Sequence, residues 1–154
     1  MAPKCVRYRA AGWGSGELWL DGDVPVWHEL PHGGADEDDA DHPLTRRLVA
    51  FFRGEDVSFG DVALDLADEA PFHQALAATL RAVPRGEVVT YGELAALAGH
   101  PNAQRAAGSV CAQNRFPLVV PCHRVVAAGG LGGYGSLGLE YKRRLLELEG
   151  HVVH

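Results

Sequence analysis

Two stretches near the start of the chain alternate apolar and polar residues, and a third follows them with a weaker pattern. Because successive side chains of a strand point to opposite faces, this alternation predicts β-strands. The predicted strands are 5–10, 16–20 and 24–30, of which the third is the least regular. A segment with two glycines and five acidic residues, 31–41, predicts a solvated loop.

The spacing of apolar residues changes to three and four from Leu44 onwards, which predicts helices. The first predicted helix, 44–52, follows Pro43 and ends near Gly54. The later predicted helices are 71–83, 91–98, 103–112 and 139–149. Thr90 is placed to cap the helix at 91–98, and a short turn, 99–102, leads into the next one. Two helices joined in this way form a helix-turn-helix.

An apolar run, Leu118–Val126, is interrupted at its centre by Pro121, Cys122, His123 and Arg124. A cysteine reacts as its thiolate, whose population rises when a base or a positive charge lies nearby. Neighbouring side chains of a strand point to opposite faces, so the histidine reaches the thiol only if the backbone turns, and the proline offers that turn. The alternative is a structural cysteine buried in a sheet. The combination of these four residues favours catalysis over packing.

The predicted helix 103–112 carries mostly small side chains, and Arg105 is the one long side chain near its start. Small residues suit close helix packing, and they also let a helix backbone approach DNA. Proteins that read the major groove present several long polar side chains to the base edges, which this helix does not. The pattern therefore favours minor-groove binding with little sequence readout.

The net charge of the 154 residues is −6, but it is distributed unevenly. Residues 1–70 carry 6 basic and 15 acidic side chains, a net charge of −9, whereas residues 71–154 carry 8 and 5, a net charge of +3. This sign change predicts two modules, with modest and salt-sensitive DNA affinity in the second. The three cysteines have no framework spacing, and no long apolar run is present, so we expect a cytoplasmic protein with reduced thiols.

The chain resembles the O6-alkylguanine-DNA alkyltransferases, single-turnover repair proteins. The matching segments are Val120–Val125, Gly86–Ala95, Arg105–Gly108, Asn114, Tyr134 and Lys142–Gly150. The resemblance covers about 71–150 strongly and the first seventy residues loosely. It implies an α+β fold in which a small N-terminal α/β module, ribonuclease H-like, spans 1–68. A mostly helical, winged-helix-like DNA-binding domain, 69–154, would carry the cysteine.

The resemblance also implies a catalytic role for five residues. Cys122 would take the alkyl group from O6-alkylguanine by in-line displacement, after the base has been flipped out of the duplex. His123 would accept the thiol proton through a water molecule, and Glu149 would orient the imidazole. Asn114 would tie the helix-turn-helix to the active-site turn, and Tyr134 would donate a proton or hydrogen bond to the departing guanine.

Further residues are assigned by the resemblance alone. Pro117, Tyr134, Ser136 and the carbonyls of Cys122 and Val125 would bind the substrate base. Tyr91, Gly92, Arg105 and Arg124 would contact DNA, with Arg105 entering the space left by the flipped base. No metal or organic cofactor is implied, and we expect a monomer that acts on double-stranded DNA. Activity on O4-alkylthymine is left open, as is an N-terminal structural zinc site at Cys5 and His28.

The sequence departs from the family pattern after Tyr134, where the segment 135–138 leaves the hydrogen-bond donor for O6 unassigned, and at Arg115–Phe116, which is bulkier than usual. Three alternative functions would each require a feature of their own. A non-catalytic alkyltransferase-like protein has tryptophan in place of Cys122. A helix-turn-helix regulator would need a dimerisation helix and a base-reading surface, and a cysteine hydrolase would need an oxyanion hole. The sequence signals none of these features.

Overall fold

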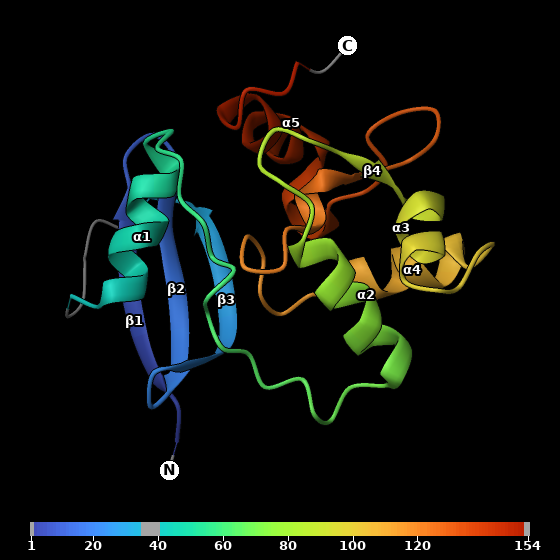
Figure 1. Ribbon diagram of the computed structural model, residues 1–154. Coiled ribbons are helices and arrows are strands. Elements are labelled where there is room, and N and C mark those ends of the chain that lie inside the picture. Colours follow the sequence, from blue (N-terminus) through green and yellow to red (C-terminus); the bar gives the residue numbers. More distant parts are fainter. Residues whose placement is uncertain (1, 35–40, 153–154) are drawn as a thin grey trace. The chain divides into compact units, whose positions relative to one another are not determined.

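The computed structural model describes residues 2–34 and 41–152 (Figure 1). Its internal contacts divide the chain into two compact units. One unit contains the residues up to Asp65 together with Arg115–Pro117, and the other contains Leu66–Asn114 and the residues from Leu118 onwards. The fold is therefore mixed, with a small sheet in the first unit and most of the helices in the second.

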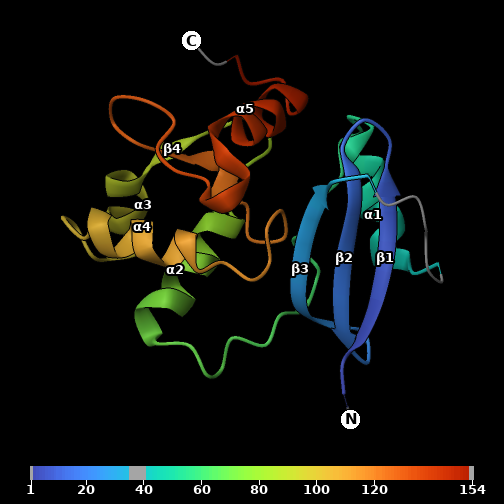
Figure 2. The ribbon, with the colours of Figure 1, turned by 180° about the vertical axis from the view of Figure 1, so that it is seen from behind.

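The first unit is a three-stranded antiparallel sheet covered on one face by a helix, as Figures 1 and 2 show from opposite sides. The strands are β1 (Lys4–Ala10), β2 (Gly14–Asp21) and β3 (Val24–His32), and the helix is α1 (Pro43–Phe52). The three predicted strands and the predicted helix are confirmed. The core contains one set of alternating strand residues and the apolar stripe of α1: Val6, Tyr8, Ala10, Leu18, Leu20, Leu48 and Phe51.

The predicted loop 31–41 was wrong at its start. Strand β3 continues through Pro31 and His32, because His32 pairs with Ser15 after a register shift in β2. Residues 35–40 of this predicted loop lie outside the described residues. Helix α1 then begins after His42, whose Nδ1 accepts a hydrogen bond from the backbone N–H of Leu44 at 3.0 Å.

The second unit packs four helices around a short parallel strand pair. The helices are α2 (Pro71–Arg81), α3 (Tyr91–Leu97), α4 (Gln104–Ala112) and α5 (Gly138–Leu148), and the strands are β4 (Val89–Thr90) and β5 (Val125–Val126). All four predicted helices are confirmed. The buried side chains are apolar residues of these helices and of β5: Leu76, Leu80, Leu94, Val125, Leu145 and Leu146. The pairing of β5 with β4 places the end of the Leu118–Val126 segment beside the start of α3.

The helix-turn-helix forms as predicted, from α3, a short turn and α4. Thr90 and Glu93 make a capping box: the Thr90 hydroxyl accepts from the Glu93 N–H at 3.0 Å, and Glu93 accepts from the Thr90 N–H at 2.9 Å. Gly99 and Asn102, both with positive φ, turn the chain between the helices. Of the α4 side chains, Ala107 is buried and Arg105 is exposed, so the long basic residue faces solvent.

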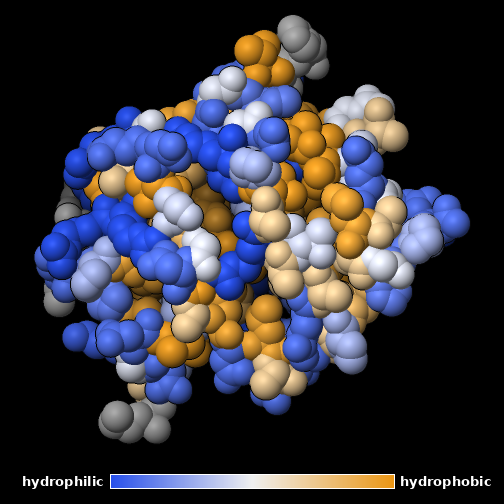
Figure 3. Space-filling view, viewed as in Figure 1, coloured by the Kyte–Doolittle hydropathy of each residue, from blue (hydrophilic) through white to orange (hydrophobic). Residues whose placement is uncertain are grey.

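Polar and apolar side chains intermix on the face of the molecule shown in Figure 3. Among the large apolar residues that stay exposed, Trp19 and Trp27 are cross-strand partners on the sheet. Within residues 2–34 and 41–152, every helix is too short or too polar to span a bilayer.

Candidate active site

The backbone turns at the reactive motif instead of continuing as a strand. Cys122–Arg124 form one turn of 3-10 helix, in which the Arg124 N–H donates to the Pro121 carbonyl at 2.9 Å. Val125 then enters β5. This geometry removes the strict alternation of a strand, so Cys122 reaches Asn114 while His123 and Arg124 both reach Glu149.

Strain precedes this turn. Leu118 is buried and has a φ of 76°, in the left-handed region that bulky side chains rarely adopt. It follows Arg115–Pro117, which group with the first unit, and it leads into the Val119–Val120 segment before the motif. An outlier of this kind is maintained only when surrounding contacts fix the backbone, and such outliers cluster at functional sites.

Cys122 is buried, and its sulfur accepts a hydrogen bond from the side-chain amide of Asn114 at 3.2 Å. The same amide nitrogen donates to the Val120 carbonyl at 2.8 Å, and the Asn114 N–H donates to the Cys111 carbonyl at the end of α4. Asn114 therefore connects the helix-turn-helix to the reactive turn. Burial raises the pKa of the Cys122 thiol, whereas the Asn114 hydrogen bond and the positive charge of Lys142 lower it.

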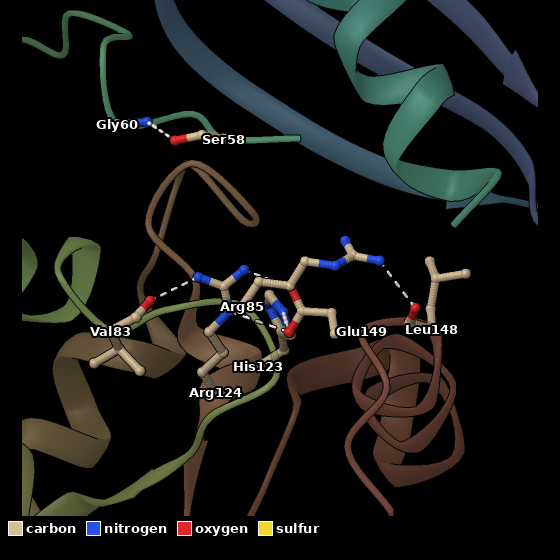
Figure 4. A network of polar contacts seen from close by, with 8 residues as sticks. All are labelled: Ser58, Gly60, Val83, Arg85, His123, Arg124, Leu148 and Glu149. Carbon is tan, nitrogen blue, oxygen red and sulfur yellow. Dashed lines mark hydrogen bonds and ion pairs between the residues drawn. The ribbon is translucent and has the colours of Figure 1, made fainter. Parts of the chain in front are cut away.

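His123 and Glu149 form a buried pair at the C-terminus of α5 (Figure 4). The His123 Nε2 and the Glu149 Oε1 are 2.9 Å apart, and neither side chain is exposed to solvent. Because a carboxylate only accepts hydrogen bonds, Nε2 carries the proton and Nδ1 is the basic nitrogen of the neutral ring. Burial lowers the pKa of His123, and the Glu149 carboxylate acts against this shift.

Glu149 is the C-cap of α5, held there by the turn that ends the helix. Gly150 has a φ of 86°, the His151 N–H donates to the Leu146 carbonyl, and the Gly150 N–H donates to the Glu147 carbonyl. These two bonds define a Schellman motif. Arg85 adds a hydrogen bond to the Leu148 carbonyl at 3.1 Å (Figure 4). The helix end is thus fixed, and with it the carboxylate that faces His123.

Arg124 does not extend into solvent. Its Nε and one terminal nitrogen donate to the two oxygens of Glu149, at 3.1 and 2.5 Å, and its other terminal nitrogen donates to the Val83 carbonyl at 2.8 Å. Burial alone would raise the pKa of Glu149, but the hydrogen bonds from His123 and Arg124 lower it to about 2. This placement favours a structural role for Arg124 over the DNA contact that was expected, because hydrogen bonds to Glu149 and Val83 hold its guanidinium inside the protein.

Tyr134 lies in the glycine-rich loop and stacks on Tyr141, with ring centroids 6.3 Å apart. Its hydroxyl is buried and lies beside the Cys122 thiol. Burial and then the nearby Cys122 thiol raise its pKa well above the usual value, so the hydroxyl is protonated at neutral pH. A buried donor of this kind next to the nucleophile suits a contact with substrate. Ser136, in the following 3-10 turn, is exposed.

The other three residues expected to contact DNA lie at the starts of the two helices of the helix-turn-helix. Tyr91 and Gly92 open α3, and Arg105 is the second residue of α4. The Tyr91 ring packs against Gly132 so closely that a Cβ at that glycine would lie 2.9 Å from it. Burial, followed by the nearby Cys111 thiol, raises the pKa of Tyr91, and the Cys122 thiol adds to the shift. Tyr91 is therefore close to the reactive turn, while Arg105 is exposed.

Lys142 is a site residue to which the sequence analysis gave no role. It is completely buried, and its ammonium donates to the carbonyls of Val125, Leu131 and Gly133 at 2.5, 2.6 and 3.2 Å. Its spacing from Leu145 and Leu146 places it on the buried stripe of α5, a signal that the sequence contains. The Val125 carbonyl, which was expected to hold the substrate amine, thus already accepts one hydrogen bond.

Two sites considered from the sequence involve residues of the first unit: the pocket wall at Pro117 and the zinc site at Cys5 and His28. The Pro117 carbonyl accepts from His28 Nδ1 at 2.8 Å, and the Tyr8 hydroxyl donates to His28 Nε2 at 2.6 Å. The Cys5 thiol donates to Glu17 at 3.5 Å. Within residues 2–34 and 41–152, no three potential metal ligands gather at one point. His28 is therefore a buried, hydrogen-bonded core residue, and the role of Pro117 in lining a pocket stays a prediction.

A small cavity of about 10 Å³ lies beside the nucleophile within the second unit. Its lining is mostly apolar, from α2, α4 and the reactive turn, and includes Leu76, Leu80, Val110, Cys111, Asn114 and Cys122. A space of this volume accommodates about one water molecule. Burial raises the pKa of Cys111 to about 12, which leaves this second thiol protonated and poorly nucleophilic.

Comparisons with known proteins agree with this geometry. Residues 71–151 match the family described as 6-O-methylguanine DNA methyltransferase, DNA binding domain. A methylated-DNA–protein-cysteine methyltransferase of Methanopyrus kandleri is 49% identical over 110 residues, which are 71% of this chain and 80% of that protein. The crystal structure of Mycobacterium tuberculosis OGT in complex with DNA superimposes with a TM-score of 0.79 at 35% identity, covering 94% of this chain and 92% of that one. The O6-methylguanine-DNA methyltransferase of Pyrococcus kodakaraensis gives a TM-score of 0.72 at 25% identity, with 95% and 98% covered.

Proposed function

Since the chain belongs to the O6-methylguanine DNA methyltransferase family, we propose that it repairs DNA by transferring the alkyl group of O6-alkylguanine to Cys122. The observation that carries this proposal is the arrangement of the reactive turn. The Cys122 sulfur is held by Asn114, and the adjacent His123 is held by a buried carboxylate. This arrangement provides a nucleophile, a base and a group that orients the base.

The thiol of Cys122 is protonated in the resting protein, because burial raises its pKa. His123 Nδ1 takes the thiol proton through a bridging water, and Glu149 stabilises the imidazolium that results. The sulfur lone pair then forms a bond to the alkyl carbon while the bond from that carbon to O6 breaks. The bonding pair remains on the guanine, which recovers a proton from the Tyr134 hydroxyl or from solvent. The thioether product is stable, so each molecule acts once.

The helix-turn-helix presents the substrate. Arg105 is exposed on a helix of small residues, which suits insertion from the minor groove into the space left by the flipped nucleotide. Tyr91 and Gly92, at the start of α3, contact the flanking backbone. The net charge of +3 over 71–154 attracts DNA weakly, so affinity falls as salt concentration rises. Arg124 is left out of this surface, since Glu149 and Val83 bind its guanidinium.

The finer architecture belongs to the same proposal. We place a small ribonuclease H-like module at 1–68 and a winged-helix-like domain at 69–154, in which β4 and β5 accompany the helix-turn-helix. The protein acts as a cytoplasmic monomer on double-stranded DNA. Guanine is bound by Tyr134, Ser136, Pro117 and the carbonyls of Cys122 and Val125. O4-alkylthymine is a secondary substrate to be tested beside O6-methylguanine.

Intact-protein mass spectrometry after incubation with a duplex containing O6-methylguanine tests the proposal. We expect one methyl group per protein molecule, and the same duplex recovered with unmodified guanine. Cys122→Ala should bind the duplex without gaining the methyl group. Repeated turnover, or repair without a modified protein, would contradict the proposal and favour a hydrolase. DNA binding without methyl transfer by the unchanged protein would favour a non-catalytic lesion-binding protein.

A further inference from the structure

The chain contains two lysines, Lys4 and Lys142, and the second is completely buried. Taking an ammonium group out of water is costly unless it is paired or fully hydrogen-bonded. All three N–H donors of Lys142 are used, each on a backbone carbonyl, and none is used on a carboxylate. Its charge is therefore solvated by dipoles but not cancelled by an opposite charge.

The three carbonyls belong to two segments that the sequence separates. Val125 directly follows the 3-10 turn of Cys122, whereas Leu131 and Gly133 lie in the glycine-rich loop just before Tyr134. Of this loop, residues 131–134 adopt no regular secondary structure. A glycine-rich segment loses much conformational entropy when it is ordered, so it needs specific contacts to hold one conformation. Lys142 provides such contacts and links the loop to the reactive turn.

The same ammonium lies beside the aromatic side chains of the site. Its Nζ is 5.8 Å from the centre of the Tyr91 ring and 6.0 Å from the centre of the Tyr134 ring. These distances fall within or at the limit of the range in which a cation is attracted to a ring face. Lys142 thus contacts both the loop that carries Tyr134 and the helix start that carries Tyr91.

The bond to the Val125 carbonyl holds the Lys142 ammonium against the end of the reactive turn, and its charge lowers the pKa of the Cys122 thiol. Arg124 is near in sequence, but its guanidinium is paired with Glu149. The other titratable or charged groups around the thiol come from each element packed there: His73 of α2, Tyr91 of α3, Cys111 of α4, Tyr134 of the loop, and His123 with Glu149. Among these groups Lys142 is the cation whose N–H donors are all used on backbone carbonyls, and burial lowers its own pKa while the Cys122 thiol acts against that shift.

We propose that Lys142 is a positioning residue, which holds the glycine-rich loop and Tyr134 against the reactive turn and places its ammonium beside the segment that carries Cys122. The proposal deepens the alkyl-transfer function and rests on it for its effect on repair. The two effects are separable, since a neutral side chain removes the charge and a longer cation keeps it. Neither effect requires Lys142 to touch the substrate.

The test uses Lys142→Met, Lys142→Gln and Lys142→Arg, with Lys4→Met as the matched control on β1 in the first unit. The rate of Cys122 modification by iodoacetamide is followed against pH by peptide mass spectrometry, a readout that works whether or not the protein repairs DNA. We expect both neutral variants to need a pH about one unit higher for half-maximal rate, a roughly tenfold loss of thiolate at neutral pH. Lys142→Arg should retain the original midpoint, and Lys4→Met should change nothing.

Hydrogen exchange of residues 129–135 reports the second effect. We expect faster exchange of this loop in Lys142→Met and Lys142→Gln, because neither side chain has three N–H donors for the three carbonyls, and unchanged exchange in the control. Lys142→Gln decides the outcome if Lys142→Met fails to fold. An unchanged thiol profile together with unchanged loop exchange would overturn the proposal. If the unchanged protein shows no methyl transfer but the Lys142 variants still shift the pH dependence of Cys122 modification, the role of Lys142 stands and the proposed function is refuted.

Discussion

The Nε2 of His123 lies 2.9 Å from Oε1 of Glu149, and both side chains are completely shielded from solvent. A carboxylate at the C-terminal end of a helix is unfavourable for the helix dipole by roughly 0.3–1 kcal/mol. Here two hydrogen-bonded partners offset that cost, since Arg124 binds the same carboxylate. The pair fixes the tautomer of His123 and leaves Nδ1 as the base.

Replacing Glu149 with glutamine should therefore slow alkyl transfer. The amide stabilises imidazolium less than a carboxylate does, so we expect the single-turnover rate of Glu149→Gln to fall most strongly below pH 8, with the pKa of the Cys122 thiol raised. DNA affinity should be unchanged. The measurement is the pH dependence of the single-turnover rate, and superimposable profiles for the two proteins would remove Glu149 from the mechanism.

The same substitution should also reduce stability, because it leaves the Arg124 guanidinium without its anionic partner. Removing one member of a buried ion pair costs about 3–5 kcal/mol. Urea unfolding at pH 7 measures this loss, and the double variant Arg124→Met with Glu149→Gln should recover part of it. A double variant no more stable than Glu149→Gln would show that the guanidinium is not the source of the loss.

Acid should weaken the first unit through His28. Burial lowers the pKa of this histidine from 6.5 to about 4, while hydrogen bonding to Pro117 opposes the shift. Between these two values the unfolded chain binds a proton that the folded chain does not, so stability is full above pH 6.5 and falls as the pH drops towards 4. Once His28 is protonated in both states, the free energy of unfolding has fallen by about 3 kcal/mol. Thermal unfolding of His28→Gln should depend less on pH across this interval than that of the unchanged protein, although its stability at pH 7 will be lower.

Arg105 should matter for duplex DNA and little for a free base. Its side chain is exposed on α4, outside the buried network of the reactive turn. Arg105→Ala is expected to slow repair of O6-methylguanine in a duplex by at least about tenfold, equivalent to 1.4 kcal/mol of transition-state stabilisation. Its reaction with free O6-benzylguanine, which requires no base flipping, should stay within about twofold of the original rate. Equal losses with both substrates would contradict a role in flipping.

The sequence predicts those parts of the structure that depend on local chemistry. Helix α3 begins where Thr90 and Glu93 can form a capping box, and α5 ends at Leu148, two residues before Gly150, so the sequence predicts both helices to within two residues. The sequence also predicts the turn at Pro121, because a proline ring fixes its own φ angle and removes a backbone N–H donor. The proximity of His123 and Glu149, which are 26 residues apart, followed only from the family resemblance.

Long-range hydrogen bonds explain what was missed. The hydrogen bonds of Arg124 to Val83 and Glu149 could not be predicted, because no local pattern in the sequence shows that these residues surround its guanidinium. Lys142 was overlooked because its partners are backbone carbonyls, which every residue carries. Likewise, Arg115–Pro117 group with the first unit, where His28 bonds the carbonyl of Pro117.

The chain's three cysteines allow the most direct test of alkyl transfer to Cys122. Cys111 lines the same cavity as Cys122, but burial raises its pKa to about 12, and Asn114 donates to its backbone carbonyl, whereas it donates to the sulfur of Cys122. After reaction with a duplex carrying isotopically labelled O6-methylguanine, peptide mapping should locate one methyl group per molecule on Cys122. Label on Cys5 or Cys111, or label absent from all three while the duplex is repaired, would contradict the mechanism.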